Sequence, residues 1–133
     1  MRFTCDTSVL VPALLPWHEQ HAPCRAAAQR AHDVGAHVLI ECFSVLTRLP
    51  SPHRLSPSDA SRLVLGMPLS VISLPGSEHR SLVQTLAANG IGGGAVYDAL
   101  VGATAQHHGL TLLTRDVRAR AVYDLVGVRV ESI

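Results

Sequence analysis

The sequence contains no lysine, because all eleven of its basic residues are arginines. This absence excludes the chemistries that need a side-chain amine. P-loop nucleotide binding, Schiff-base formation and catalysis by a lysine base all belong to that group. Any reaction that this chain catalyses must therefore depend on other side chains or on a bound cofactor.

Charge of either sign is also scarce. Charged residues make up 16% of the chain, and the formal net charge is +1. A nucleic acid could not be held by a broad basic field, so it would have to be bound locally. Hydrophobic residues reach 47%, which is too many for a disordered chain. We expect residues 1–133 to form a single domain around one core.

Cysteines and long apolar runs are few. Cys5, Cys24 and Cys42 are odd in number and lack close CxxC spacing, so they indicate neither a disulfide framework nor a zinc ribbon. No run approaches the ~20 apolar residues of a membrane span. The apolar N-terminal stretch is interrupted by Asp6 and Pro12, which favours a core segment over a signal peptide. We expect a soluble, cytoplasmic protein without a membrane partner.

Short apolar segments alternate with helical ones along the whole chain. Apolar spacing, caps, glycines and prolines predict strands at 2–5, 36–40, 69–74, 110–113 and 128–131. The same signals predict helices at 7–15, 17–34, 41–49, 56–66, 77–88, 95–108 and 117–125. Parallel neighbours need crossovers of this length, so the fold class we expect is α/β, a three-layer α/β/α arrangement with a five-stranded parallel sheet.

Acidic residues follow several of the predicted strands. Asp6 comes directly after the first strand, Glu41 directly after the second, and Asp116 after the fourth with two residues in between. Parallel strands end at one edge of their sheet, where open α/β sheets bind ligands, so these three carboxylates should converge. A fourth acid, Asp98, lies in the first turn of the predicted helix 95–108.

The segment around Asp98 contains many small residues. Gly102 and Ala105 lie at helical spacing beyond it, so that helix face can approach other backbone closely. The glycine-rich stretch 90–94 resembles a dinucleotide-binding loop in composition only. It joins two predicted helices and lacks the required spacing, so we interpret it as a flexible turn before Asp98.

Each of these acids taken alone is most simply a helix cap. Four together differ, because two carboxylates about 4 Å apart repel by ~4 kcal/mol at an effective dielectric near 20, whereas a helix dipole returns ~0.3–1 kcal/mol. Protonation or a cation must neutralise them. All-oxygen ligands favour Mg²⁺ or Mn²⁺ over zinc. A second cluster, His18, His21 and Cys24, lacks a fourth ligand and is set aside.

A divalent cation held by acids can activate water and clamp a phosphodiester oxygen. The arginines near Asp116 suit such a substrate, because a guanidinium matches the geometry of a phosphate. Arg115 and Arg118 are the candidates for contact with RNA, whereas Arg54 and Arg120 are more simply interpreted as solvated surface.

Four stretches carry a resemblance to a known family. They are Cys5–Leu10 (CDTSVL), Leu39–Glu41 (LIE), Tyr97–Ala105 (YDALVGATA) and Leu112–Asp116 (LLTRD). In order and spacing they resemble the four signature segments of PIN-domain ribonucleases, specifically the VapC-type toxins of type II toxin–antitoxin pairs. Each stretch alone is common, but their succession in a chain of this length is specific, and the resemblance runs essentially from end to end.

The resemblance implies a PIN-like fold and a Mg²⁺- or Mn²⁺-dependent endoribonuclease. Four acids would be catalytic and bind the metal: Asp6, Glu41, Asp98 and Asp116. Three hydroxyl residues would orient the carboxylates or water: Thr7, Ser8 and Thr114. The resemblance also implies a homodimer, a VapB-like antitoxin, and transfer or ribosomal RNA as substrate. Tyr97, a variable position in the family, receives no role.

Two other functions fit part of the pattern. Receiver domains and haloacid-dehalogenase-like phosphatases also place an acid after the first strand, but both normally use a lysine, and no second aspartate lies two residues after Asp6. A catalytically silent PIN-like binding module would keep the acids only as caps. Loss of one or more acids would mark such a module, whereas here all four positions are filled.

Overall fold

The computed structural model of the chain describes residues 1–133. Its strands are β1 (Phe3–Cys5), β2 (Ala31–Gly35), β3 (Ser70–Ile72), β4 (Thr111–Thr114) and β5 (Val130–Ser132). They form one five-stranded sheet in the order β3-β2-β1-β4-β5, and each pair of neighbours is parallel. The expected α/β class with a five-stranded parallel sheet is confirmed.

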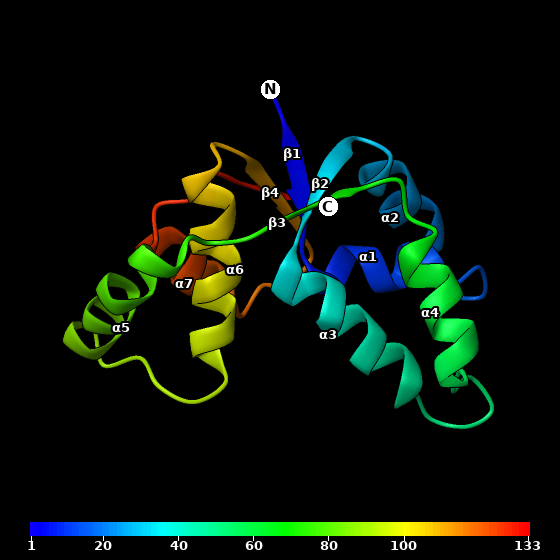
Figure 1. Cartoon of the computed structure of the whole chain (residues 1–133). Coiled ribbons are helices and arrows are strands. Elements are labelled where there is room, and N and C mark those ends of the chain that lie inside the picture. The colour runs from blue at the N-terminus through cyan, green and yellow to red at the C-terminus, as the bar shows by residue number, and fades with distance from the viewer.

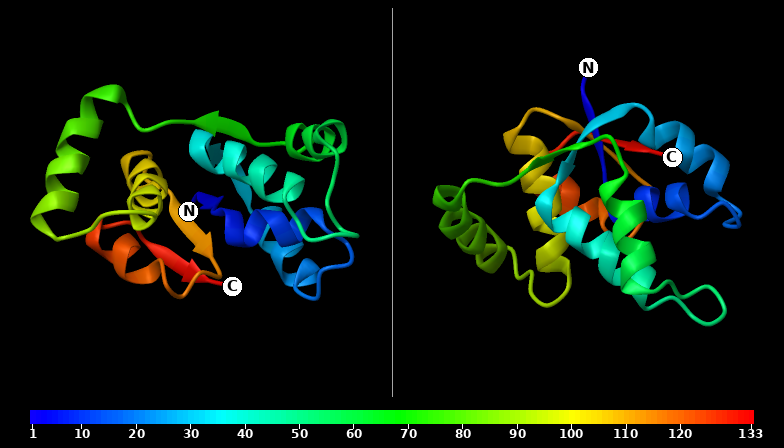
Figure 2. Two further views of the ribbon diagram at one scale, coloured as in Figure 1. Left: turned by 90° about the horizontal axis from the view of Figure 1, so that it is seen from below. Right: turned by 45° about the vertical axis from the view of Figure 1, so that its right-hand side comes forward.

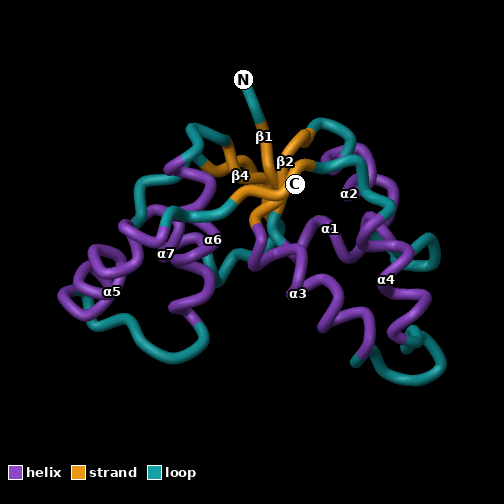
Figure 3. Tube along the Cα trace, viewed as in Figure 1, coloured by secondary structure: helices purple, strands orange, loops and turns teal.

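Helices cover both faces of this sheet. They are α1 (Thr7–Leu14), α2 (His21–Ala28), α3 (Ala36–Thr47), α4 (Pro57–Leu65), α5 (His79–Ala88), α6 (Ala95–His107) and α7 (Arg120–Leu125), with a 3₁₀ turn at Gly76–Glu78. In Figure 1, α1–α4 lie to the right of the strands and α5–α7 to the left. Figure 3 shows the strands in orange between these two groups of helices. None of the helices is both long and apolar enough to cross a membrane.

The chain changes direction across the sheet between β1 and β4. From β1 it proceeds through α1–α4 to β2 and β3, whereas from β4 it proceeds through α7 to β5 at the other edge. The loops after two neighbouring strands therefore lead to opposite faces, which is where open α/β sheets bind ligands. Cys5 pairs with Leu113, and the Asp6 N–H donates to the Leu113 carbonyl at 3.2 Å, so Asp6 lies beside Thr114.

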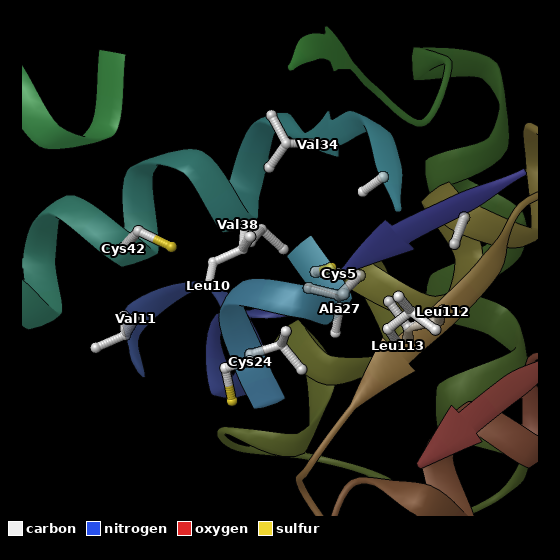
Figure 4. Close-up of a cluster of buried hydrophobic side chains, with 14 of the residues drawn as sticks. Cys5, Leu10, Val11, Cys24, Ala27, Val34, Val38, Cys42, Leu112 and Leu113 are labelled. Atoms are coloured by element: carbon white, nitrogen blue, oxygen red, sulfur yellow. The ribbon is translucent and has the colours of Figure 1, made fainter. Parts of the chain in front are cut away.

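A core of 22 buried residues joins the central strands to α1, α2 and α3. Figure 4 shows Leu112 and Leu113 of β4 in the same cluster as side chains from α1, α2 and α3. The three cysteines belong to this core as free thiols. Burial raises the pKa of both Cys5 and Cys42 to about 12, so these thiols stay protonated at neutral pH. The sequence indicated no disulfide framework, and in the structure all three cysteines are free, buried thiols.

Two of the predicted elements are wrong. The predicted helix 17–34 ends at Ala28, and its last part is β2. The predicted strand 36–40 is the first part of α3, a helix that begins directly after Gly35. Glu41 therefore lies inside a helix and not directly after a strand. The other boundaries differ by only a few residues.

The pattern of burial explains both errors. In α3 the buried residues Val38, Cys42 and Leu46 recur at four-residue spacing, while Ile40 is 68% exposed, as a helix requires and a buried strand does not. In β2, Asp33 is buried although aspartate is disfavoured in strands. Its partner is Arg2, which lies far from it in the sequence. The Arg2 guanidinium binds its carboxylate at 2.5 Å.

Gly102 allows α6 to pack closely on α7. A Cβ atom placed on Gly102 would lie 2.7 Å from Val126 Cγ2 and 3.0 Å from Tyr123 Cδ1. This close approach agrees with the small-residue face expected from the sequence. It also brings Tyr123 to the edge of the sheet at which β1 ends.

We expect Gly102→Val to lower the free energy of unfolding by about 1–3 kcal/mol, because the added methyl groups overpack this contact. Gly92→Val is the matched control, since nothing lies within 4 Å of a Cβ at Gly92. The control should change stability by less than about 0.5 kcal/mol. Urea unfolding followed by circular dichroism measures both. Equal midpoints for the two variants would contradict the close approach.

Candidate active site

The side chain of Asp6 is buried at the carboxyl end of β1, where only 4% of the residue is exposed. As the N-cap of α1, it accepts the Ser8 N–H at 3.0 Å. It also accepts hydrogen bonds from the hydroxyls of Ser8 at 2.5 Å, of Thr114, and of Tyr123 at 2.8 Å. Donors from α1, β4 and α7 thus hold one carboxylate in place.

Burial and charge act against the ionisation of Asp6. Burial raises the pKa of Asp6 above its ordinary value, the three hydroxyl donors lower it, and the nearby charge of Asp116 raises it. Burial, together with the charge of Asp6, also raises the pKa of the Tyr123 hydroxyl. Tyr123 therefore remains a proton donor to Asp6 at neutral pH.

The loop after β4 is held against the loop after β1. The Thr114 hydroxyl, which donates to Asp6, also accepts the Asp116 N–H at 3.0 Å. The Arg115 N–H donates to the Ser8 hydroxyl at 2.8 Å. The Asp116 carboxylate accepts the N–H groups of Arg118 at 3.0 Å and Ala119 at 3.1 Å. These bonds fix Asp116 beside Asp6 across the two neighbouring strand ends.

Glu41 reaches the same edge from α3. This helix begins directly after β2, and Glu41 lies in its second turn. The Thr7 hydroxyl at the start of α1 donates to Glu41 Oε1. His37, one turn earlier in α3, places Nε2 3.7 Å from Glu41 Oε2. The position of Glu41 thus depends on helix packing, and not on a strand end as the sequence analysis expected.

Asp98 approaches from the opposite face of the sheet. It lies in the first turn of α6, and the last turn of α6 leads into the start of β4, so the first turn lies toward the carboxyl edge. The views of Figure 2 show α3 in cyan and α6 in yellow on either side of the strands. Burial raises the pKa of Asp98, and the charges of Asp116, Glu41 and Asp6 raise it further. The four acids therefore share one electrostatic environment.

The acids are close enough to influence one another, yet Asp6, Glu41 and Asp116 are each turned toward their own hydrogen-bond donors. No three acidic, histidine or cysteine side chains lie in the arrangement that holds a metal ion. An ion shared by three of these carboxylates would thus require some of their side chains to move. As metal ligands, these four side chains are otherwise suitable. Their ligand atoms are carboxylate oxygens, and a cation would relieve the repulsion among them.

The two candidate arginines are placed differently. Arg118 is exposed, and its charge lowers the pKa of Asp98, so its guanidinium lies near the acids. Arg115 is half-buried. Burial raises the pKa of the Cys24 thiol and the charge of Arg115 lowers it, which places this guanidinium toward α2. Arg118 is therefore better placed to meet a ligand at the acids.

Sequence analysis did not find two residues that contact the acids. Tyr123 lies 117 positions after Asp6 and carries no local motif, so only the packing of α6 on α7 brings its hydroxyl to the carboxylate. His37 was hidden by the incorrect strand assignment. With α3 recognised as a helix, the four-residue spacing between His37 and Glu41 would have placed them on one face.

We expect Asp98→Asn to raise the thermal unfolding midpoint near neutral pH. A carboxyl whose pKa is raised by folding holds its proton more tightly in the folded state, so ionisation above the unfolded value of 3.8 destabilises the fold. The gain should vanish once the pH falls below that value, where the carboxyl is protonated in both states. Thermal melts in chelator between acid and neutral pH measure it.

Glu19→Gln is the control for this prediction, because Glu19 is an exposed acid in the loop after α1. It should show no comparable gain at neutral pH. A lower midpoint for Asp98→Asn at neutral pH would contradict the crowding of the four charges.

Known proteins with similar sequences and folds agree with this architecture. The family model described as PIN domain matches residues 3–125. Ribonuclease VapC40 of Mycobacterium tuberculosis is 43% identical to this chain over 129 residues, which cover 96% of each chain. Ribonuclease VapC27 of the same organism is 44% identical over 126 residues, which cover 94% of this chain and 92% of that protein.

Solved structures show the same fold at low sequence identity. The DNA-bound VapBC structure from Salmonella typhimurium matches with a TM-score of 0.71 and 19% identity, over 99% of this chain and 98% of that one. The VapBC2 structure from Rickettsia felis, bound to a promoter DNA fragment, matches with a TM-score of 0.68 and 16% identity, over 100% and 99% of the two chains. Because the family model and both M. tuberculosis relatives match almost the whole chain, this protein belongs to the PIN domain family and, within it, to the VapC-type ribonucleases.

Proposed function

We propose that this protein is a divalent-metal-dependent endoribonuclease and the toxin of a toxin–antitoxin pair. The observation that carries the proposal is the proximity of the four acids. The Thr114 hydroxyl bonds both the Asp6 carboxylate and the Asp116 N–H, and the charges of Asp116, Glu41 and Asp6 raise the pKa of Asp98. The M. tuberculosis relatives, which are named ribonucleases, support the choice of RNA as the substrate. The absence of lysine excludes a hydrolytic mechanism that uses a lysine base or nucleophile.

The acids Asp6, Glu41, Asp98 and Asp116 would hold Mg²⁺ or Mn²⁺, and they would be the catalytic residues. A hard cation fits them because all of their donor atoms are oxygens. When bound, the cation would supply the positive charge that lowers the pKa of a water molecule and stabilises charge on the phosphodiester. It would also offset the repulsion that opposes the ionisation of Asp98.

The other residues of the site orient these carboxylates. Ser8, Thr114 and Tyr123 hold Asp6 by donating hydrogen bonds to both of its oxygens. Thr7 holds Glu41 in the same way. Fixing carboxylates in advance reduces the cost of assembling the site when substrate binds. Arg118, and less directly Arg115, would contact RNA phosphate through a guanidinium.

The proposed partners follow from the relatives. The solved relatives from Salmonella and Rickettsia are VapBC assemblies, so we propose a VapB-like antitoxin for this chain. We further propose a homodimer that acts in the cytoplasm, with a structured RNA such as transfer or ribosomal RNA as the substrate. The resemblance of the four sequence stretches to those of VapC-type toxins supports each of these assignments.

Asp6→Asn should abolish RNA cleavage, with a loss of at least about 100-fold, because the central negative charge is removed. The fold should persist, because asparagine also caps helices well. Asp33→Asn is a matched control. Asp33 is likewise a buried aspartate, but it pairs with Arg2 and not with the acids of the site. Cleavage by purified Asp6→Asn at the parent rate would refute the catalytic assignment.

EDTA should stop cleavage, and added Mg²⁺ or Mn²⁺ should restore it. A second readout is independent of activity: Mn²⁺ should raise the thermal midpoint of the parent, since a ligand that binds only the folded state stabilises it. Asp98→Asn should show a smaller rise, because one carboxylate is lost. Undiminished cleavage in EDTA, together with no effect of Mn²⁺ on the midpoint, would remove the metal from the proposal.

A further inference from the structure

Two aromatic rings from opposite sides of the site lie in parallel. Tyr97 in the first turn of α6 stacks with His37 in the first turn of α3, with ring centroids 5.3 Å apart and an interplanar angle of 3°. This is the offset geometry that aromatic pairs prefer. The pair thus connects the two helices that carry Asp98 and Glu41.

Tyr97 is unusual among the aromatic residues of this chain. Of the five phenylalanine, tyrosine and tryptophan residues, only Tyr97 and Trp17 are exposed, at 55% and 52%. Tyr123 is buried, and both phenylalanines pack against the core. The Tyr97 ring therefore presents aromatic surface to solvent and is not part of the hydrophobic core.

The ring pair lies directly beside the acids. Tyr97 precedes Asp98 in the chain, and His37 contacts Glu41, with Nε2 3.7 Å from Oε2. Exposed hydrophobic residues are also next in sequence to two of the acids, since Ile40 before Glu41 is 68% exposed and Val117 after Asp116 is 87% exposed. The segments that carry the acids thus include exposed apolar residues as well as charge.

An RNA strand at this site needs contacts other than charge attraction. The net charge of +1 provides little general attraction for a polyanion, and the acids repel it. Bases have π faces that stack on aromatic side chains, and such stacking occurs when the bases are unpaired and splayed out. When a phosphate lies at the acids, the base of an adjacent nucleotide is the part of the strand close enough to meet Tyr97.

We infer that the Tyr97–His37 ring pair is a stacking platform for an unpaired base next to the scissile phosphate. This inference rests on the proposed ribonuclease function and assigns a role to a tyrosine to which the family pattern gives none.

The test compares Tyr97→Ala with the parent protein. Binding is measured by the fluorescence anisotropy of a short, fluorescein-labelled single-stranded RNA of mixed sequence, with EDTA present so that the RNA is not cut. Tyr97→Ala should weaken binding by about 5- to 100-fold, the loss expected when one base–aromatic stack is removed. In Mg²⁺, KM for the same RNA should rise by a similar factor while kcat changes little.

Three controls separate stacking from other roles. Tyr97→Phe should bind within about two-fold of the parent, because the ring and its stacking are retained. Trp17→Ala should also leave binding unchanged, since Trp17 is an exposed aromatic that stacks with His53, outside the set of residues that contact the acids. A fully paired duplex of the same sequence should bind parent and Tyr97→Ala equally, because its bases are already stacked.

Several outcomes would overturn the platform. Unchanged single-strand affinity in Tyr97→Ala would do so, and so would a loss of kcat at constant KM, which would instead indicate a role in positioning Asp98. An equal loss of affinity for single strand and duplex would point to a contact with the backbone. If the parent cleaves RNA and Asp6→Asn does not, the proposed function stands whatever Tyr97→Ala shows. If the parent cleaves no RNA, that function fails independently.

Discussion

The buried carboxylate of Asp6 is the contact on which the rest of this site depends. It ends β1, caps α1 and accepts hydroxyl hydrogen bonds from Ser8, Thr114 and Tyr123. The sheet reverses its connection direction between β1 and β4, so no single local segment could supply these donors. A buried carboxylate without such partners would strongly disfavour folding. The full set of hydrogen bonds to this carboxylate therefore forms only when the two halves of the protein pack together.

The remaining acids show why this edge of the protein is suited to function more than to stability. Burial and three neighbouring charges raise the pKa of Asp98, so its ionised form destabilises the fold at neutral pH. Few compensating charges lie nearby, although Arg118 lowers the same pKa. Side chains whose pKa values are perturbed in this way are concentrated at functional sites. A cation bound by the acids would relieve this repulsion, and the relief would favour its binding.

Recognition at the site combines two kinds of surface. Four carboxylates suit a hard cation and the phosphate that it would bind, but they offer nothing to a nucleobase. The Tyr97–His37 pair supplies the missing apolar contact and spans α3 and α6. Because these helices lie on opposite sides of the sheet, a ligand that touches both rings and acids would be bound by both halves of the fold.

Much of this protein could be predicted from its sequence, since alternating apolar segments and turns indicate a parallel α/β sheet, and Asp6, Asp98 and Asp116 carry recognisable local motifs. Periodicity failed between residues 17 and 40, where an alanine-rich run and a short apolar run each suited either element. Long-range contacts such as the Arg2–Asp33 ion pair, which local periodicity does not report, stabilise the observed strand. By itself, the sequence determined the fold class and the candidate acids, because capping and apolar spacing are local properties. Only the tertiary structure decided that Glu41 arrives on a helix, that Tyr123 holds Asp6 and that Tyr97 meets His37, because each of these contacts joins segments whose approach depends on the packing of the entire sheet.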